Sequence, residues 1–350
     1  MSAQPPRRAR DLGIVPGQLP PGPFNALTDV AGVRVGHATV TEGDDIRTGV
    51  TAIVPTALGP DRRTLPAAID VGNGYGKLVG STQVDELGVI ETPILLTSTL
   101  STYRVADALL DYVLSQPGNE GLTSVNIVVG ETNDGYLSDI RRRVVTAEHV
   151  REALAAASSG PLDEGCVGAG TGTMALGYKA GIGSASRRVP VGGVDATLGA
   201  LVQSNFGGRL TVLGVPASPD LLLEPTAEAV APPGNSCMIV LATDAALDAR
   251  QLGRLARRGV VALARVGSDY SHGSGDYAIA FSTAAELGPV ADADLSPMFS
   301  AALECVEEAV LNSLLMATTT VGFRGRRAEA LPHRALVERL AAAGVLTERP

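Results

Sequence analysis

The sequence predicts a layered α/β fold that covers nearly the whole chain. Apolar runs of strand length alternate with longer runs of helical spacing, a pattern typical of packed layers of sheet and helix. Of the 350 residues, 45% are hydrophobic and 19% are charged, which supplies enough apolar material for a sizeable core. No internal repeat of fixed period is present. We therefore expect one domain spanning residues 1–350.

The first half of the chain predicts four strands and two helices. The strand segments are VRVGHATV, GVTAIVP, PILLTST and SVNIVVGE, at residues 33–40, 49–55, 93–99 and 124–131. Residues 102–121 have helical spacing and end in Pro and Gly. A second helix follows Thr146, whose hydroxyl suits an N-cap, and Glu148 lies near the positive end of that helix. The Pro-rich residues 1–22 have no apolar segment behind their arginines, and we expect a flexible arm rather than a signal peptide.

The second half begins with a glycine-rich stretch at residues 165–186. Strands are then expected at residues 196–207, 210–216, 236–244 and 276–283, and helices at residues 248–266, 296–322 and 334–346. Residues 217–235 are the most linker-like interior segment. The run GAGTGT at residues 168–173 lacks the spacing of a nucleotide-binding loop, so its glycines are expected to allow close approach of the backbone to a pocket or another strand.

Charge and composition exclude several classes of function. With 28 basic and 37 acidic residues the net charge is −9, and aromatic residues make up only 3%, so we expect no nucleic-acid partner. The three cysteines form no CxxC and the four histidines are widely spaced, so we expect no metal and no cofactor. No apolar run is long enough for a membrane helix, and a cytoplasmic location without a membrane partner is expected.

A serine stands where a loose loop enters an apolar strand, in APPGNSCMIVLATDA. Ser236 is the first residue of the apolar run, and small residues and two prolines precede it. Asn205 ends an upstream strand and could donate a hydrogen bond to an oxyanion. Ser274 and Asp276 precede a downstream strand. These four residues are the side chains that acyl transfer requires, without a histidine.

The missing base is itself informative. A serine hydroxyl needs an adjacent base to act as a nucleophile. If the bond between Asn235 and Ser236 were cut, Ser236 would carry a free α-amine with a pKa of about 7.7–8 in reference peptides, which could serve as that base. The loose leader would let this bond reach the hydroxyl of Ser236 for an N-to-O acyl shift.

Long segments of the chain resemble one known family. They include GPFNALTDVAGVRVGHATV, GETNDGYLSDI, VGAGTGTMALGYKAGIGSASR, LVQSNFG, GNSCMIVLATDAALDARQLGRLARRG and GSGDYAIAFST. The sequence is similar from end to end to the DmpA-like L-aminopeptidase/D-esterase and β-peptidyl aminopeptidase family, also known as peptidase family S58.

The resemblance implies a self-processing N-terminal-nucleophile (Ntn) hydrolase with an αββα four-layer sandwich and DmpA-type strand connectivity. It implies cleavage into chains 1–235 and 236–350 that stay together, and a homo-oligomer, expected to be a tetramer of such αβ units. Ser236 matches the nucleophile and Asn205 the oxyanion asparagine. Ser274 matches a serine that hydrogen-bonds near the nucleophile, and Asp276 matches the acidic residue of the same motif.

A pocket tyrosine of the family falls at either Asn133 or Tyr136. The first alignment would change the pocket and the second would preserve it. The expected activity is removal of N-terminal residues from small peptides, amides or esters. The alternatives are a linear-amide hydrolase or acyltransferase on a related scaffold, against which the serine at this position counts, and a catalytically silent binding relative.

Overall fold

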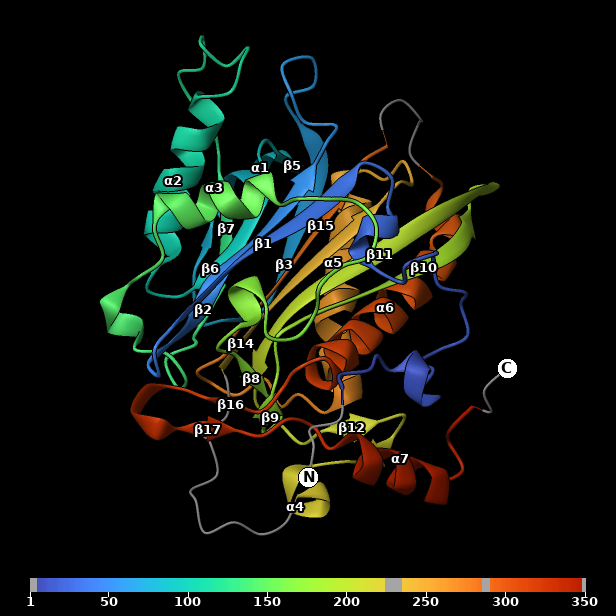
Figure 1. Ribbon diagram of the computed structural model, residues 1–350. Coiled ribbons are helices and arrows are strands. Elements are labelled where there is room, and N and C mark those ends of the chain that lie inside the picture. The colour runs from blue at the N-terminus through green and yellow to red at the C-terminus, as the bar shows by residue number, and fades with distance from the viewer. Residues whose placement is uncertain (1–4, 224–234, 285–289, 348–350) are drawn as a thin grey trace.

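The computed structural model describes residues 5–223, 235–284 and 290–347, and in it two β-sheets lie face to face between two layers of helices (Figure 1). Helices α2 (Thr102–Leu114) and α3 (Ala147–Ala155) cover the outer face of one sheet. Helices α5 (Ala249–Ala262) and α6 (Ser296–Leu315) cover the outer face of the other. The four layers confirm the αββα sandwich.

The first sheet has the strand order β1-β2-β6-β7-β4. Its strands are β1 (Val33–Glu42), β2 (Ile46–Pro55), β6 (Ile94–Ser98), β7 (Val128–Thr132) and β4 (Leu78–Val79). The β6–β7 pair is parallel and connected through α2, whereas the other neighbours are antiparallel. All five residues of β7 are buried, as expected for a strand covered on both faces.

The second sheet has the order β10-β11-β14-β15-β3-β5. Its strands are β10 (Ile182–Val191), β11 (Val194–Phe206), β14 (Asn235–Thr243), β15 (Gly275–Ser282), β3 (Leu65–Gly74) and β5 (Val89–Ile90). Strand β14 lies between β11, to which it is antiparallel, and β15, to which it is parallel. The strand that begins at the Asn235–Ser236 junction is therefore central in the sheet.

Smaller elements complete the fold. They are the helices α1 (Ser81–Leu87), α4 (Pro219–Leu222) and α7 (His333–Ala342), and the short pairs β8 (Met174–Ala175) with β9 (Tyr178–Lys179), β12 (Thr211–Val212) with β13 (Val215–Pro216), and β16 (Thr320–Val321) with β17 (Arg327–Ala328). Thr146 is the N-cap of α3, as predicted. No helix in the described part of the chain has both the length and the apolarity to cross a membrane.

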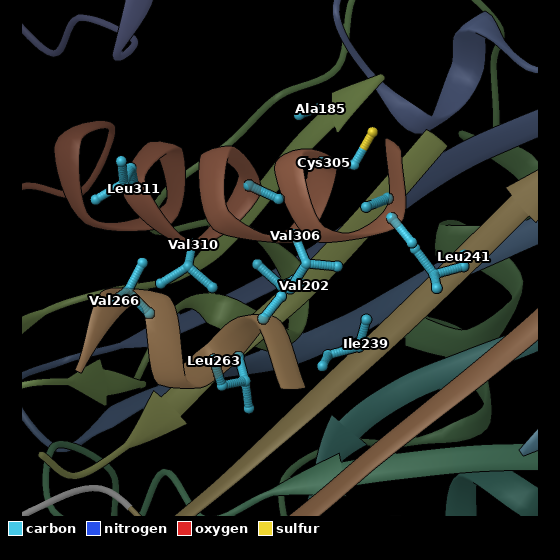
Figure 2. Close-up of a cluster of buried hydrophobic side chains, with 14 of the residues drawn as sticks. Ala185, Val202, Ile239, Leu241, Leu263, Val266, Cys305, Val306, Val310 and Leu311 are labelled. Carbon is cyan, nitrogen blue, oxygen red and sulfur yellow. The ribbon is translucent and has the colours of Figure 1, made fainter. Parts of the chain in front are cut away.

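Three apolar cores in the described part of the chain join these layers. One packs α2 and α3 on the first sheet and includes Leu109 and Val150, and the other two lie on the two faces of the second sheet. Of these two, one lies between α6, α5 with its following turn, and the second sheet, where Val306 and Val310 of α6 meet Ile239 and Val202 (Figure 2). The other lies between the two sheets and contains Met238 and Val240 of β14. Alternate residues of β14 thus face opposite cores, so Cys237 and Ile239 point to the helices while Met238 points to the other sheet.

Two long strands were not predicted from the sequence, β3 and β10. In β10 the buried positions include Ser184, Ser186 and Arg187, which no apolar pattern reveals. Their partners come from distant parts of the chain, since Arg187 ion-pairs with Glu304 and Glu308 of α6. The expected single strand at residues 210–216 is instead the tight β12–β13 hairpin. The expected linker at 217–235 contains α4, and its residues 224–234 lie outside the described part of the chain.

The prediction of a flexible N-terminal arm is wrong for the described residues 5–22. Ala9 and Ile14 are fully buried. The Arg8 guanidinium lies 2.7 Å from a Glu164 carboxylate oxygen, and that of Arg10 lies 2.9 Å from Glu308 of α6. No local pattern indicates this anchoring, because the acidic partners are more than 150 residues away in the sequence.

Candidate active site

The candidate nucleophile and the candidate oxyanion donor lie directly opposite each other on neighbouring strands. Asn205 of β11 pairs with Ser236 of β14 in the antiparallel register. Both side chains are buried, and the Asn205 Nδ2 atom is 3.5 Å from the Ser236 Oγ atom. Facing positions of a sheet point to the same side, which here is the side of the first sheet. The structure therefore brings together two residues that are 31 positions apart in sequence.

The amide group of Asn205 is held in a defined orientation from both ends. Its Oδ1 atom accepts a hydrogen bond of 3.1 Å from the backbone N–H of Met174. Its Nδ2 group donates at 3.1 Å to the backbone carbonyl of Asn133. Because the partner at one end is an N–H donor and the partner at the other end is a carbonyl acceptor, the positions of the amide oxygen and the amide nitrogen of Asn205 are assigned. The second N–H of Asn205 is consequently directed to the Ser236 hydroxyl, close to where the carbonyl oxygen of an attacked group would lie.

The glycine-rich loop 168–174 carries the Met174 N–H to Asn205. Two of its glycines are needed for close backbone approach, as expected from the sequence. A Cβ atom on Gly170 would lie 2.4 Å from the nitrogen of Ile182, and one on Gly172 would lie 2.0 Å from the carbonyl oxygen of Arg47. The loop is thereby wedged between the two sheets, and no nucleotide-binding role is required to explain it.

Ser274 and Asp276 form a pair at the same end of the sheet. The Ser274 hydroxyl donates at 2.9 Å to Asp276 Oδ1. Ser274 immediately precedes Gly275, which pairs with Ser236 in the parallel register, so strands β14 and β15 begin side by side. Asp276 pairs with Cys237, a residue of the helix-facing core, and the Asp276 carboxyl therefore lies on the opposite side of the sheet from the Ser236 hydroxyl.

Asp276 is a fully buried carboxyl, with an exposed fraction of 0%. Burial raises its pKa to about 6, and the hydrogen bond from Ser274 opposes that rise. Its Oδ2 atom has no hydrogen-bond partner among the described residues. This carboxyl does not contact the Ser236 hydroxyl, because the two side chains lie on opposite sides of the sheet.

The two alternatives for the pocket tyrosine occupy different places. Asn133 is exposed, contacts Asn205 through its backbone carbonyl, and accepts a hydrogen bond from the N–H of Gly135 with its side chain. Tyr136 packs beside Met174 and lies under the guanidinium of Arg326, 5.1 Å from the ring centroid. Asn133 thus contacts Asn205, the candidate oxyanion donor, through its backbone.

Glu131 is a residue that the sequence reasoning missed. It is 3% exposed and is the penultimate residue of β7. It accepts a 3.0 Å hydrogen bond from the N–H of Lys77 and forms an ion pair of 3.3 Å with the ammonium group of the same lysine. A Cβ atom on Gly76 would lie 3.0 Å from a Glu131 oxygen and 3.2 Å from the Tyr277 hydroxyl, so these groups converge. A cavity of about 730 Å³ opens at this place and is lined by Gly76, Lys77 and Tyr277 among others. The available sequence signal was an acidic residue at the end of an apolar strand.

The peptide bond expected to be cut lies at the edge of what the structure describes. Strand β14 begins at Asn235, and Ser236 is its second residue. The leader at residues 224–234 lies outside the described part of the chain. The fold has two packed sheets between helical layers, and a buried serine hydroxyl lies at the start of a central strand with an amide donor opposite it. This combination is typical of an N-terminal-nucleophile hydrolase.

The chain belongs to peptidase family S58, whose model matches residues 25–328. It is 38% identical to β-peptidyl aminopeptidase BapA of Sphingosinicella microcystinivorans, over 96% of this chain and 92% of that protein. Among solved structures it is similar to the PH0078 protein of Pyrococcus horikoshii OT3, with 45% identity, a TM-score of 0.90, and 97% and 100% of the two chains covered.

A third relative connects the fold to the chemistry. The L-aminopeptidase D-Ala-esterase/amidase of Ochrobactrum anthropi, a prototype of the serine aminopeptidases with a variant of the Ntn hydrolase fold, has 34% identity and a TM-score of 0.87, covering 97% of this chain and 99% of that one. The protein is accordingly an N-terminal aminopeptidase, a hydrolase of peptide bonds with an Ntn-type serine nucleophile.

Proposed function

We propose that the chain activates itself by cutting the bond between Asn235 and Ser236, and that Ser236 then removes N-terminal residues from small peptides, amides or esters. The observation that carries this proposal is the facing pair of Asn205 and Ser236 at the start of β14, with the Asn205 amide oriented at both ends. This geometry supplies a nucleophile and an oxyanion donor at the position where cleavage would create the new terminus.

Self-cleavage requires only the chain and one water molecule. The Ser236 hydroxyl attacks the carbonyl carbon of Asn235, and the Ser236 nitrogen leaves as a free amine, so that an ester replaces the peptide bond. Water then hydrolyses the ester. The products are the Asn235 carboxylate at the end of the larger chain and the free α-amine of Ser236 at the start of the smaller chain.

The same serine would then act on substrate. The α-amine of Ser236, with a reference pKa of about 7.7–8, accepts the hydroxyl proton while Oγ attacks the substrate carbonyl. The Asn205 Nδ2 group donates to the oxyanion, and the amine returns its proton to the leaving nitrogen. Water hydrolyses the acyl-enzyme by the reverse order of proton transfers. Ser274, bonded to Asp276, precedes the residue that pairs with Ser236, and this pair would help to stabilise the charged form of the new amine.

Glu131 and the adjoining cavity suit the free amine of an aminopeptidase substrate. A buried carboxylate attracts an ammonium group more strongly than an exposed one, because solvent screens it less. The relative BapA is a β-peptidyl aminopeptidase. Since a β-amino group lies one carbon further from the scissile carbonyl, we propose that this chain accepts β-aminoacyl as well as α-aminoacyl groups.

The substrate proposal is tested with p-nitroanilides of L-alanine, D-alanine and β-alanine, assayed on the purified chain. We expect release of p-nitroaniline from at least one of them, and loss of that activity in Ser236→Ala. A purified, folded chain that hydrolyses none of the three would contradict the proposed substrates. Transfer of an acetyl group from acetyl-ornithine to glutamate, with no anilide hydrolysis, would instead indicate an acyltransferase.

We also propose a homo-oligomer of αβ units in the cytoplasm. Exposed apolar side chains support the first point, since Val71, Tyr75 and Tyr103 are 52%, 67% and 68% exposed around the cavity side of the molecule. Free thiols support the second, because Cys166, Cys237 and Cys305 form no disulfide. Light scattering coupled to size exclusion tests the oligomer, which a monomer mass would contradict.

A further inference from the structure

Lys179 is a fully buried amine underneath the glycine-rich loop. Its exposed fraction is 0%. The Nζ atom lies 2.9 Å from the carbonyl oxygen of Thr173 and 3.2 Å from that of Gly170, and it also bonds the carbonyl of Ala180. Three carbonyl acceptors match the three N–H donors of an ammonium group, which a neutral amine cannot all supply.

The contact with Thr173 leads directly to the candidate oxyanion donor. The carbonyl of Thr173 and the N–H of Met174 belong to the same peptide group. That N–H donates to Asn205 Oδ1 at 3.1 Å, and Asn205 Nδ2 points at the Ser236 hydroxyl at 3.5 Å. An unbroken series of hydrogen bonds therefore runs from a buried cation through one peptide and one amide to the Ser236 hydroxyl, beside which the carbonyl oxygen of an attacked substrate would become negatively charged.

We propose that Lys179 is a positioning residue that polarises this series, so that Asn205 becomes a stronger donor to the oxyanion. This inference rests on the proposed function of Ser236 and Asn205. A cation on a peptide carbonyl withdraws electrons from the peptide nitrogen and strengthens its N–H as a donor. The Asn205 amide responds in the same way, because hydrogen bonds in series polarise one another and do so most where solvent is excluded.

Lys179 has the contacts that a buried ammonium group requires. Burial lowers the pKa of Lys179 below its ordinary value, and the neighbouring Cys166 thiol and Asp134 carboxyl oppose this shift without cancelling it. Asp134 is itself 2% exposed and accepts a 2.8 Å hydrogen bond from the Ser98 hydroxyl. A buried ammonium with three carbonyl acceptors and a nearby carboxyl satisfies the requirement that buried charge be hydrogen-bonded and compensated.

The loop is also held by contacts that do not involve Lys179. The N–H of Gly168 donates at 2.8 Å to Thr39, and that of Ala169 donates at 3.1 Å to Thr51. The Thr171 hydroxyl donates at 2.7 Å to the carbonyl of Gly168. Removing the charge of Lys179 should thus leave the loop near its place, and the polarising role can be separated from simple support of the fold.

The test compares Lys179→Gln and Lys179→Met with the wild-type chain on the p-nitroanilide that the wild type hydrolyses best. Glutamine removes the charge but keeps two N–H donors for the carbonyls, whereas methionine removes both. Rates are divided by the fraction of chains with a free Ser236 terminus, measured by intact mass. We expect the kcat of both variants to fall about tenfold or more while KM changes less than about twofold, because the oxyanion exists only in the transition state.

A double-mutant cycle with Asn205→Ala distinguishes polarisation from structural support. Asn205→Ala alone should lower kcat by about 10²–10³, the usual loss for one oxyanion donor. If Lys179 acts through Asn205, adding Lys179→Gln to Asn205→Ala should lower kcat by less than about a further threefold. If its effect is purely structural, the fold-losses of the two single variants should multiply in the double variant.

Thermal unfolding establishes whether the variants are folded. If Lys179→Met does not fold, the kcat of Lys179→Gln alone tests the polarising role of Lys179. A folded Lys179→Gln with the kcat of the wild type overturns the inference, and so do losses that multiply in the cycle. Both results would leave the proposed function standing. An uncut, inactive wild-type chain would remove the proposed function and this inference with it.

Discussion

Asp276 is a buried carboxyl whose ionisation is opposed by the removal of its solvent. Its carboxyl is fully buried with one hydroxyl donor, and burial raises its pKa from 3.8 to about 6. The folded chain therefore holds the proton more tightly than the unfolded chain. As pH rises from about 4 to about 6, the unfolded chain loses its proton first, and the free energy of unfolding falls through that window.

Asp276→Asn should remove this loss of stability. Relative to the wild type, the variant should gain on the order of 2–3 kcal/mol between pH 4 and pH 7, since each unit of pKa corresponds to about 1.4 kcal/mol. Urea unfolding at several pH values measures the free energy of unfolding of both proteins. The contribution of other buried carboxyls cancels in the difference between the two. Parallel stability curves for the two proteins would contradict the account of Asp276.

Ser236 and Asn205 were predictable from the sequence because each stands at the end of an apolar strand with an unusual polar side chain. Met174 was not predictable, because it acts through its backbone N–H, which every residue except proline has. Lys179 carried one signal, a lysine inside a glycine-rich and apolar stretch, but its acceptors are carbonyl groups placed by the fold.

At the scale of elements, the orientation of Asn205 depends on the position of the glycine-rich loop at residues 168–174. Gly172 lies against the backbone of β2, where a Cβ atom would be 2.0 Å from the carbonyl oxygen of Arg47. Backbone cannot move aside as the end of a side chain can. A methyl group at this position must displace the loop and with it the Met174 N–H that orients Asn205.

Gly172→Ala should lower both stability and activity. Overpacking of this kind costs about 1–3 kcal/mol, and the displaced oxyanion donor should reduce kcat by at least about tenfold. Gly121→Ala is the matched control, because no atom lies within 4 Å of the Cβ that it would add. Thermal unfolding and anilide hydrolysis compare the two, and equal behaviour of both variants would show that the loop tolerates displacement.

The elements themselves were predicted where apolar periodicity is strong and missed where buried residues are polar. Strands β14 and β15 follow the predicted ranges to within one residue, and α5 and α6 begin close to where they were predicted. The predicted end of the last of these, at residue 322, is wrong, because α6 ends at Leu315 and Thr320–Val321 form β16. Strand β10 was missed because its buried arginine and serines are satisfied by partners far along the chain. Long-range pairing of polar groups leaves no local pattern, and the four-layer arrangement followed from the family resemblance rather than from periodicity.

At the scale of the whole molecule, the two chains expected from cleavage are interlocked. Strand β14 of the smaller chain is inserted between β11 of the larger chain and its own β15, which pairs in turn with β3 of the larger chain. Helix α6 of the smaller chain packs on β10 and β11. Cleavage between Asn235 and Ser236, the first two residues of β14, would therefore leave the layers joined, and we expect the two chains to separate only in denaturant.

The buried ion network adds polar contacts between the same parts. Arg187 of β10 is 0% exposed and lies 2.6 Å from Glu308 and 2.9 Å from Glu304, both on α6. Removing one partner of a buried pair leaves an uncompensated charge. Arg187→Met should accordingly destabilise the protein by about 3–5 kcal/mol.

The exposed i,i+4 pair of Arg334 and Glu338 provides the control for Arg187→Met. Arg334→Met should leave the free energy of unfolding almost unchanged, because exposed ion pairs contribute little to stability. Denaturant unfolding measures both variants. Similar losses in the two would show that the network between β10 and α6 contributes no more than a surface ion pair.

The central claim is that Ser236 first cuts its own chain and then serves as the N-terminal nucleophile. Intact-mass analysis of the purified 350-residue chain, together with Ser236→Ala, tests it most directly. We predict two fragments from the wild type, residues 1–235 and 236–350, the smaller beginning at Ser236, and a single uncut chain of about 35.8 kDa from Ser236→Ala. A wild-type chain that remains whole yet hydrolyses the anilides, or a Ser236→Ala variant that is still cut, would contradict the claim.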